Sequence, residues 1–296
     1  MKLANETRAV AERTLTRCFD DVHADGPWQW QCVAQNGALL SVRALLSECF
    51  LHLDCLASQD PAEAGFGSGL LERVLLRNPS LPPGVGVALR SGNSLRLCAD
   101  IAVLDESQLQ ARIHGALDGF HHGIQALFHS DVEKTDIQLP CLARGSAPEL
   151  AERIRETGWS YTERGPGEFS APLDAASAPP AIIRAGSGSV VFAVELVRLR
   201  GAAQVSHQAL ATFLLTICGS LRLVRACAWK KDEHTLFALE VSLPAIPAAD
   251  EIGHSLAVLS LAYRICAHEA AFLLDEDAAC CYLAAREFSS NHQPTE

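Results

Sequence analysis

The residues closest to a metal-binding pattern lie on one predicted helix, over residues 105–129. His114 and His121 are seven residues apart, with Asp118 four residues after the first and three before the second. At that spacing the three side chains share one helix face, where imidazole and carboxylate groups can hold a divalent cation. No thiol accompanies them and the spacing matches no established motif, so we favour a solvated helix face. We predict no metal and no other cofactor.

The eleven cysteines form no Cys-x-x-Cys pair. Most of them lie inside apolar segments, which is how free thiols behave as small core residues in a reducing compartment. Cys280 and Cys281 are adjacent, and a redox role for this pair is left open. No further ligand is spaced around the pair as a metal site requires.

Two glycine-rich segments were considered as catalytic or nucleotide-binding loops. The run from Gly65 begins like a dinucleotide-binding loop, but its sixth position is Leu70 and no strand is predicted before it. Ser187 lies between two glycines without the spacing of a nucleophile elbow, so residues 186–188 indicate a hairpin turn. We therefore predict no catalytic residue and no enzymatic activity. A nucleophilic site whose members meet only in the folded chain is left open.

Composition and charge narrow the function classes. The chain has 296 residues, of which 49% are hydrophobic and 20% charged, which is typical of two globular domains. Its net charge of -11 disfavours nucleic acid and anionic membranes as partners and favours a basic or amphipathic polypeptide. No apolar run has the length of a membrane span, and the first residues do not form a signal peptide. We expect a soluble, cytoplasmic protein.

The same order of elements is predicted twice, in residues 1–140 and in residues 141–296. The break falls in a polar connection over residues 130–147. In the first half we predict helices at 2–22, 68–77 and 105–129 and strands at 28–34, 38–46, 48–56, 85–90 and 94–103. In the second half we predict helices at 147–157, 206–218, 250–274 and 277–288 and strands at 159–162, 168–171, 182–185, 190–199, 221–229 and 234–243.

This order predicts an α+β fold of two tandem α-β-β-β-α-β-β-α domains. Each domain is expected to have an antiparallel sheet packed by helices. The helix at 277–288 is an addition to the second domain. In both halves the last long helix opens with an acidic pair, Asp105-Glu106 and Asp250-Glu251, which supports a duplication. Whether the two domains pair within one chain, as an intramolecular pseudo-dimer, or between chains is left open.

One stretch of the first half resembles a known family. A short helix ends in Asn78, a strand with glycine follows, the apolar strand 94–101 comes next, and an acidic cap at Asp105 opens the last helix. This pattern resembles the class I type III secretion chaperones (the CesT-like family) and the YbjN-like proteins, which share a fold. The resemblance implies a non-enzymatic protein that holds an extended segment of a secreted client along apolar surface patches. The alternative is a YbjN-like regulatory or adaptor protein without a secretion client.

The resemblance and the strand patterns together suggest where a client polypeptide would bind. An extended segment can add to a sheet edge, with pockets taking alternate side chains. The second half contains a strand that is apolar on both faces, and the first half contains a strand with a candidate exposed aromatic residue. The predicted protein-binding residues are Phe50, His52, Val190, Phe192 and Val194. The protein is expected to be a monomeric pseudo-dimer or a homodimer, and the sequence does not identify the client.

Overall fold

The computed structural model of the chain describes residues 2–36, 38–47, 50–58, 69–90, 94–103, 106–128, 146–174, 177–186, 189–201, 204–231, 233–244 and 247–291. The predicted domain boundary at residues 140 and 141 lies outside these ranges, as does the turn at residues 187 and 188.

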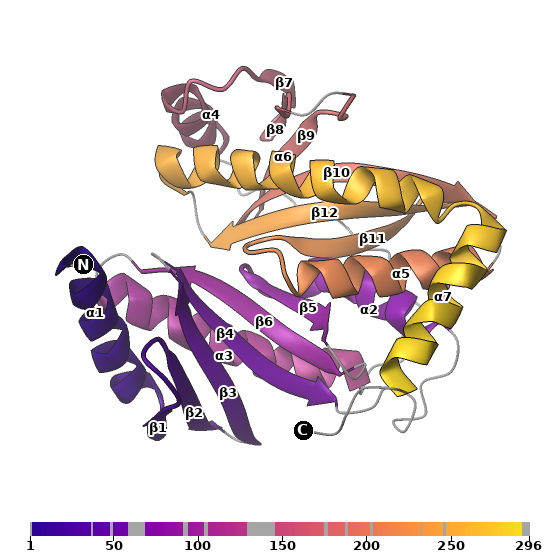
Figure 1. The fold of residues 1–296 in the computed structure, drawn as a ribbon. Coiled ribbons are helices and arrows are strands. Elements are labelled where there is room, and N and C mark those ends of the chain that lie inside the picture. The colour runs from indigo at the N-terminus through magenta and orange to yellow at the C-terminus, as the bar shows by residue number, and fades with distance from the viewer. Residues whose placement is uncertain are drawn as a thin grey trace.

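The first domain is built on a six-stranded antiparallel sheet with the strand order β1-β2-β3-β4-β6-β5. Helix α3 lies across one face of this sheet and α1 packs beside α3 (Figure 1). The elements are α1 (Lys2–Cys18), β1 (Asp21–Ala24), β2 (Gln29–Asn36), β3 (Ala38–Ser47), β4 (Phe50–Ser58), α2 (Leu70–Arg77), the 3-10 turn η1 (Asn78–Ser80), β5 (Val85–Leu89), β6 (Leu95–Ala102) and α3 (Glu106–Phe128).

The second domain has a sheet of the same size, with the order β11-β12-β10-β9-β8-β7. Helix α6 lies across β10 and β12, α4 packs against α6, and α7 packs against α5. The elements are α4 (Ser146–Glu156), β7 (Thr162–Gly165), β8 (Glu168–Ala171), β9 (Ala181–Gly186), β10 (Ser189–Arg200), α5 (Gln204–Cys218), β11 (Arg225–Lys231), β12 (His234–Pro244), α6 (Ala249–Phe272) and α7 (Glu276–Asn291).

The two domains share one topology, which confirms the predicted α+β fold of two tandem units. Read from the opposite edge, the second sheet repeats the strand order of the first, and a helix separates the last two strands from the rest in each. Alternation explains the sheets: in β6, every second side chain from Leu95 to Ile101 is buried and the residues between are partly exposed. The buried face packs against α3, which supplies Leu109 and Ile113 to the core.

One local prediction was wrong in the first domain. Helix α1 ends at Cys18 rather than residue 22, and Asp21–Ala24 forms the edge strand β1 paired with β2. Each domain therefore has four strands before its central helix.

The short helix α2 ends at Arg77, and the next residue, Asn78, has a right-handed backbone at φ -51°. The buried side chain of Asn78 bonds to two backbone groups, the carbonyl oxygen of Ala226 and the N–H of Val87.

The domains contact each other reciprocally: one helix of each domain packs against the sheet of the other. Helix α2 of the first domain packs against β11 of the second, α5 of the second packs against β5 of the first, and the two helices touch. Figure 1 shows both helices between the two sheets. Each sheet thus has its outer face, opposite its long helix, partly covered by the other domain.

Among the described residues, no single helix has the length and apolar character needed to cross a membrane. Helices α6 and α7 reach that composition together, but they meet at a bend of 110°.

Candidate functional site

The junction between the domains holds a buried ion pair on the second sheet. Arg225 on β11 and Glu240 on β12 are neighbours in register and are 5% and 2% exposed. Arg225 donates to Glu240 through Nε at 2.9 Å and also through Nη2. Burial alone would lower the pKa of the Arg225 guanidinium. The charge of Glu240, the neighbouring Cys227 and the hydrogen bonds to both together outweigh burial, so the pKa is raised.

The guanidinium of Arg225 also forms hydrogen bonds with the first domain. Arg225 Nη1 donates to the Val85 carbonyl oxygen at 2.8 Å and lies 3.3 Å from that of Leu81. Asn78 adds a second link, because its Nδ2 donates to the Ala226 carbonyl oxygen at 2.7 Å. A side chain at Gly86 would place its Cβ 2.9 Å from the Cβ of Arg225. The close approach therefore requires glycine at this position.

A different polar network lies on the outer face of the first sheet. His52 on β4 donates from Nδ1 to Asp100 Oδ1 at 2.8 Å, and Arg90 lies 3.3 Å from its Nε2. Asp54, two residues along β4, accepts a hydrogen bond from Arg96. Asp100 also accepts a hydrogen bond from the backbone N–H of Leu223 at 2.6 Å, which ties this network to the second domain.

His52, Asp54 and Cys98 bring three potential ligand atoms within 4.8 Å of one another, and this cluster was tested as a metal site. The donor set does not fit a cation. The charge of Asp54 is taken by Arg96, and Arg90 lies 3.9 Å from its other oxygen. Burial, with Asp54 nearby, raises the pKa of the Cys98 thiol far above its ordinary value, so the thiolate needed for ligation is disfavoured. We describe the cluster as an ion-pair network.

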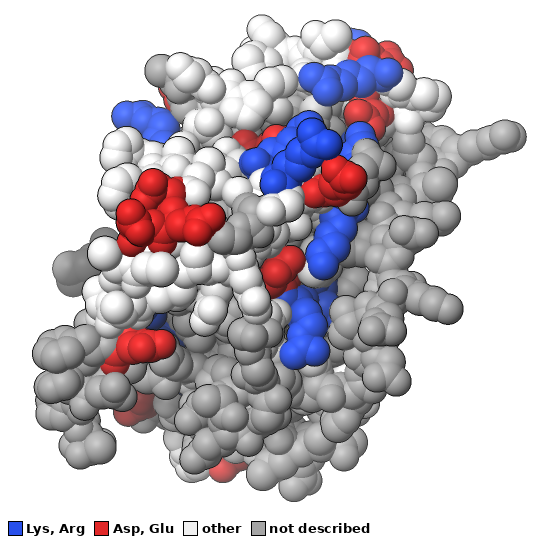
Figure 2. All heavy atoms as spheres, turned by 90° about the vertical axis from the view of Figure 1, so that its right-hand side faces the viewer, with Lys and Arg blue, Asp and Glu red and all other residues white. Residues whose placement is uncertain are grey.

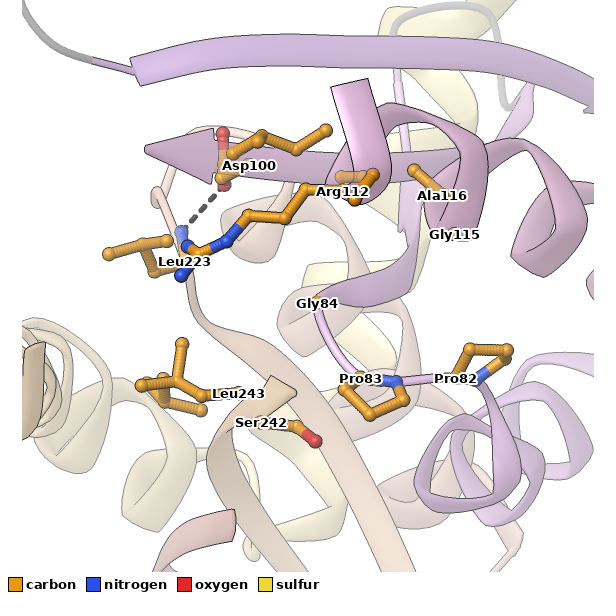
Figure 3. Close-up of a pocket in the computed structure, with 14 residues that line it drawn as sticks. Pro82, Pro83, Gly84, Asp100, Arg112, Gly115, Ala116, Leu223, Ser242 and Leu243 are labelled. Carbon is orange, nitrogen blue, oxygen red and sulfur yellow. Dashed lines mark hydrogen bonds between the residues drawn. The ribbon is translucent and has the colours of Figure 1, made fainter. Parts of the chain in front are cut away.

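A pocket of about 280 Å³ opens beside this junction. Figure 3 shows Arg112 and Asp100 on one side of the space and Ser242 and Leu243 on the other. Arg112 on α3 forms an ion pair with Glu251 on α6 at 2.8 Å. The other lining residues are mainly small or apolar: Pro82, Pro83, Gly84, Ala99, Ile101, Ala111, Gly115, Ala116, Leu223 and Val241.

The structure separates the five predicted protein-binding residues. Val190, Phe192 and Val194 on β10 are at most 1% exposed and face the core beneath α6. The residues of β10 on the other face include Val191 and Ala193, which are partly exposed. These three buried side chains cannot reach a client in this structure. A client at this strand would contact the residues of the opposite face, such as Val191 and Ala193.

The two predicted residues on β4 lie at the junction instead. His52 is 6% exposed and belongs to the ion-pair network. Phe50 is partly exposed and stacks on His254 of α6, with ring centroids 5.5 Å apart. Both residues therefore contact the chain's own neighbouring elements, and their proposed role toward a client stays a prediction.

The most exposed apolar surface was not predicted from the sequence. Among the described residues, the large apolar side chains that are exposed are Leu261 at 56%, Ile265 at 43%, Phe272 at 58% and Leu274 at 39%. The first three recur at helical spacing on α6, and we call them the α6 stripe. A sequence signal existed, because α6 carries apolar residues beyond the single face that its sheet can bury.

The equivalent surface of the first domain is polar. The buried positions of α3 match those of α6 when Leu109 is aligned with Ile252. In that alignment Asp118 occupies the place of Leu261, and His122 that of Ile265. Both are exposed. The α6 stripe is thus a property of one domain and not of the shared fold.

The described histidines of α3 and the described cysteines do not form a shared cluster in the structure. His122 contacts the backbone oxygen of Asp118 one turn before it, and His114 is exposed. All nine described cysteines are free thiols, and Cys280 and Cys281 are exposed on α7. Burial raises the pKa of the Cys32 and Cys266 thiols to about 12. These buried thiols act as core residues, and a redox role for the exposed pair stays open.

Charges of both signs mix on the face shown in Figure 2. Among the described residues, basic side chains form a row in which acidic side chains are interspersed. Such a surface gives little of the positive field that attracts a phosphate backbone.

In comparisons with protein-family models, curated proteins and solved structures, none matched the chain. The resemblance to the CesT-like and YbjN-like proteins therefore rests on the residues and element order described above.

Proposed function

We propose that the chain is a non-enzymatic protein-binding module, similar to a type III secretion chaperone, which holds an extended apolar segment of a client polypeptide. The α6 stripe is the observation that carries this proposal. Large exposed apolar side chains that share one helix face can mark an interaction surface. In the equivalent helix α3, polar residues occupy the exposed positions that align with Leu261 and Ile265. The fold therefore does not require apolar side chains at these positions, and their presence in α6 favours a binding partner.

The reciprocal contact between the domains supports the comparison with dimeric chaperones. Each domain covers the outer face of the other with one helix, α2 or α5, as two subunits of a two-fold dimer would. A chain built in this way acts as an intramolecular pseudo-dimer and needs no second copy. We therefore expect a monomer of 31.8 kDa in the absence of client.

The charge of the chain favours a basic client. A protein of net charge -11 attracts polypeptides of opposite sign over long range, while apolar contacts hold them at the surface. The proposed client segment accordingly carries apolar residues that contact Leu261, Ile265 and Phe272, flanked by lysine or arginine.

Affinity purification of the tagged protein from its native host, with mass spectrometry and light scattering, tests the proposal. The variant Ile265→Glu places a charge in the α6 stripe. The control His122→Glu places the same charge at the equivalent position of α3. We expect one dominant polypeptide to co-purify with the parent protein and with His122→Glu, and its recovery to fall at least tenfold with Ile265→Glu.

Two results would count against this function. A partner-free monomer from cells expressing a secretion system would favour the alternative function, a YbjN-like regulatory or adaptor role. A homodimer that Ile265→Glu dissociates would assign the α6 stripe to self-association and remove the need for a client.

A further inference from the structure

The pocket at the domain junction has the properties of a ligand site that the proposed function does not use. It is lined by β6, α3 and the turn before β5 from the first domain, and by Leu223 and β12 from the second. Ligand sites are commonly concave, mostly apolar, and placed between domains, with a few polar groups that orient the ligand.

A glycine in α3 points to an occupant. Glycine inside a helix costs about 1 kcal/mol relative to alanine, so a helical glycine needs a reason. Gly119 and Gly123 have one, because a Cβ there would lie 2.7 Å from Val85 and 2.9 Å from Leu97. Gly115 borders the pocket, and a Cβ at this position would meet no atom within 4 Å. No packing contact among the described residues requires glycine there, whereas a ligand against the helix would.

The second domain carries larger side chains at the corresponding positions of its long helix. In the alignment of the two long helices, Gly115 and Ala116 correspond to Val258 and Leu259, and Leu259 is fully buried. The first domain thus has smaller side chains at the positions that face the pocket.

A serine hydroxyl provides the polar contact. Ser242 on β12 lines the pocket and is 5% exposed. Its hydroxyl lies on the wall opposite Arg112 in Figure 3. A ligand with one hydrogen-bonding group could bond to this hydroxyl, because a few polar groups in a mostly apolar pocket orient a ligand.

The charges around the pocket are already matched. Arg112 is paired with Glu251 at 2.8 Å, and Asp100 is bound by His52 at 2.8 Å and lies 3.5 Å from Arg222. A charged ligand would have to break one of these pairs. An uncharged ligand would not, so we expect the ligand to be neutral.

We propose that this pocket binds a neutral aromatic molecule of one or two fused rings that carries one hydrogen-bonding group, with its ring against Gly115 and its polar group on Ser242 Oγ. The size follows from the volume: a cavity of about 150 Å³ holds benzene, and this pocket of about 280 Å³ is nearly twice as large. The inference stands independently of the client proposal, because the α6 stripe does not line the pocket.

The test uses the full-length protein and three probes, phenol, indole and 2-naphthol, followed by isothermal titration calorimetry and methyl NMR. We expect saturable binding of at least one probe at a single site, with methyl shifts at Ile101, Leu223 and Leu243. Gly115→Leu fills the pocket and should abolish binding. His114→Leu places the same side chain one position earlier on the exposed face and should bind as the parent protein does.

Removal of the hydroxyl in Ser242→Ala should weaken binding about tenfold, the value of one hydrogen bond. The methyl map of the unmodified protein gives a result even if Gly115→Leu fails to fold. Absence of saturable binding for all three probes would overturn the proposal. Methyl shifts confined to Leu261 and Ile265 would also overturn it, because they would place the probe on the α6 stripe.

Discussion

The outer faces of the two sheets occupy equivalent places at the domain junction, but their chemistry differs. On the first sheet, His52 and Asp54 form a charged network with arginines that reach partly into solvent. On the second sheet the equivalent strand β10 presents Val191 and Ala193. The charges on this face include the buried pair of Arg225 and Glu240 and the partly exposed pair of Arg184 and Glu168. The comparison shows that one duplicated fold has acquired two non-identical halves of a single interface.

The polar contacts across the junction come from different residue types in the two domains. The guanidinium of Arg225 reaches carbonyl oxygens of the first domain, and Asp100 accepts the N–H of Leu223 from the second. The contact of Arg225 has no counterpart from the edge strand of the first domain, because β5 (Val85–Leu89) contains no arginine. Two copies of either domain alone would lack these bonds, so we infer that the junction favours the pairing within the chain.

The largest expected effect comes from the buried pair. Glu240→Leu leaves Arg225 charged and without its partner, and we expect the free energy of unfolding in urea to fall by about 3–5 kcal/mol. The control Glu195→Leu removes the exposed pair with Arg198 and should change stability far less, because water screens exposed ion pairs. Equal effects in the two variants would contradict the account of the second sheet.

A smaller effect is expected on the first sheet. Asp54→Leu frees Arg90 and Arg96, whose side chains are 32% and 25% exposed and can turn to water. We expect a loss of about 1–2 kcal/mol in the same urea experiment. A loss as large as that of Glu240→Leu would show that the two faces are energetically alike, against the comparison.

Two glycines of α3 lie in different surroundings: Gly119 packs closely against Val85, whereas Gly115 borders the pocket. Gly115→Ala should stabilise the protein by about 1 kcal/mol, because it removes the backbone entropy cost without a clash. Gly119→Ala should destabilise it, since the new Cβ would lie 2.7 Å from Val85. Thermal unfolding of both variants measures the difference, and destabilisation by Gly115→Ala would show that the space beside Gly115 is closed.

The ion pair between α2 and α5 should contribute a pH dependence. A hydrogen bond with His207, together with its charge and that of Lys230, holds the pKa of Glu72 below its ordinary value despite burial. A lowered folded pKa gives stability that is present above the unfolded pKa of about 4.3 and lost as pH falls through the folded pKa. Stability curves of the parent protein and Glu72→Gln should therefore differ near neutral pH and converge in acid. A constant difference at all pH values would contradict this assignment.

The repeated order of helices and strands could be predicted from the sequence, because it follows from the hydrophobic periodicity within each segment. It did not predict β1, since Asp21–Ala24 contains one large apolar residue and continues the helical pattern. It also could not show which face of β10 meets α6, because Val190 and Val191 are equally apolar. The junction residues Arg225, Glu240, His52 and Asp100 come from distant segments, and only folding brings them together.

Site-specific photo-crosslinking tests the central claim most directly. A benzoylphenylalanine placed at Leu261 samples the α6 stripe, and one placed at Asp118 samples the equivalent surface of α3. In native-host cells we predict that position 261 crosslinks to the same polypeptide that co-purifies with the tagged protein, while position 118 does not. Equal crosslinking at both positions, or crosslinks from position 261 to a second copy of this chain alone, would contradict the proposal that α6 holds a client.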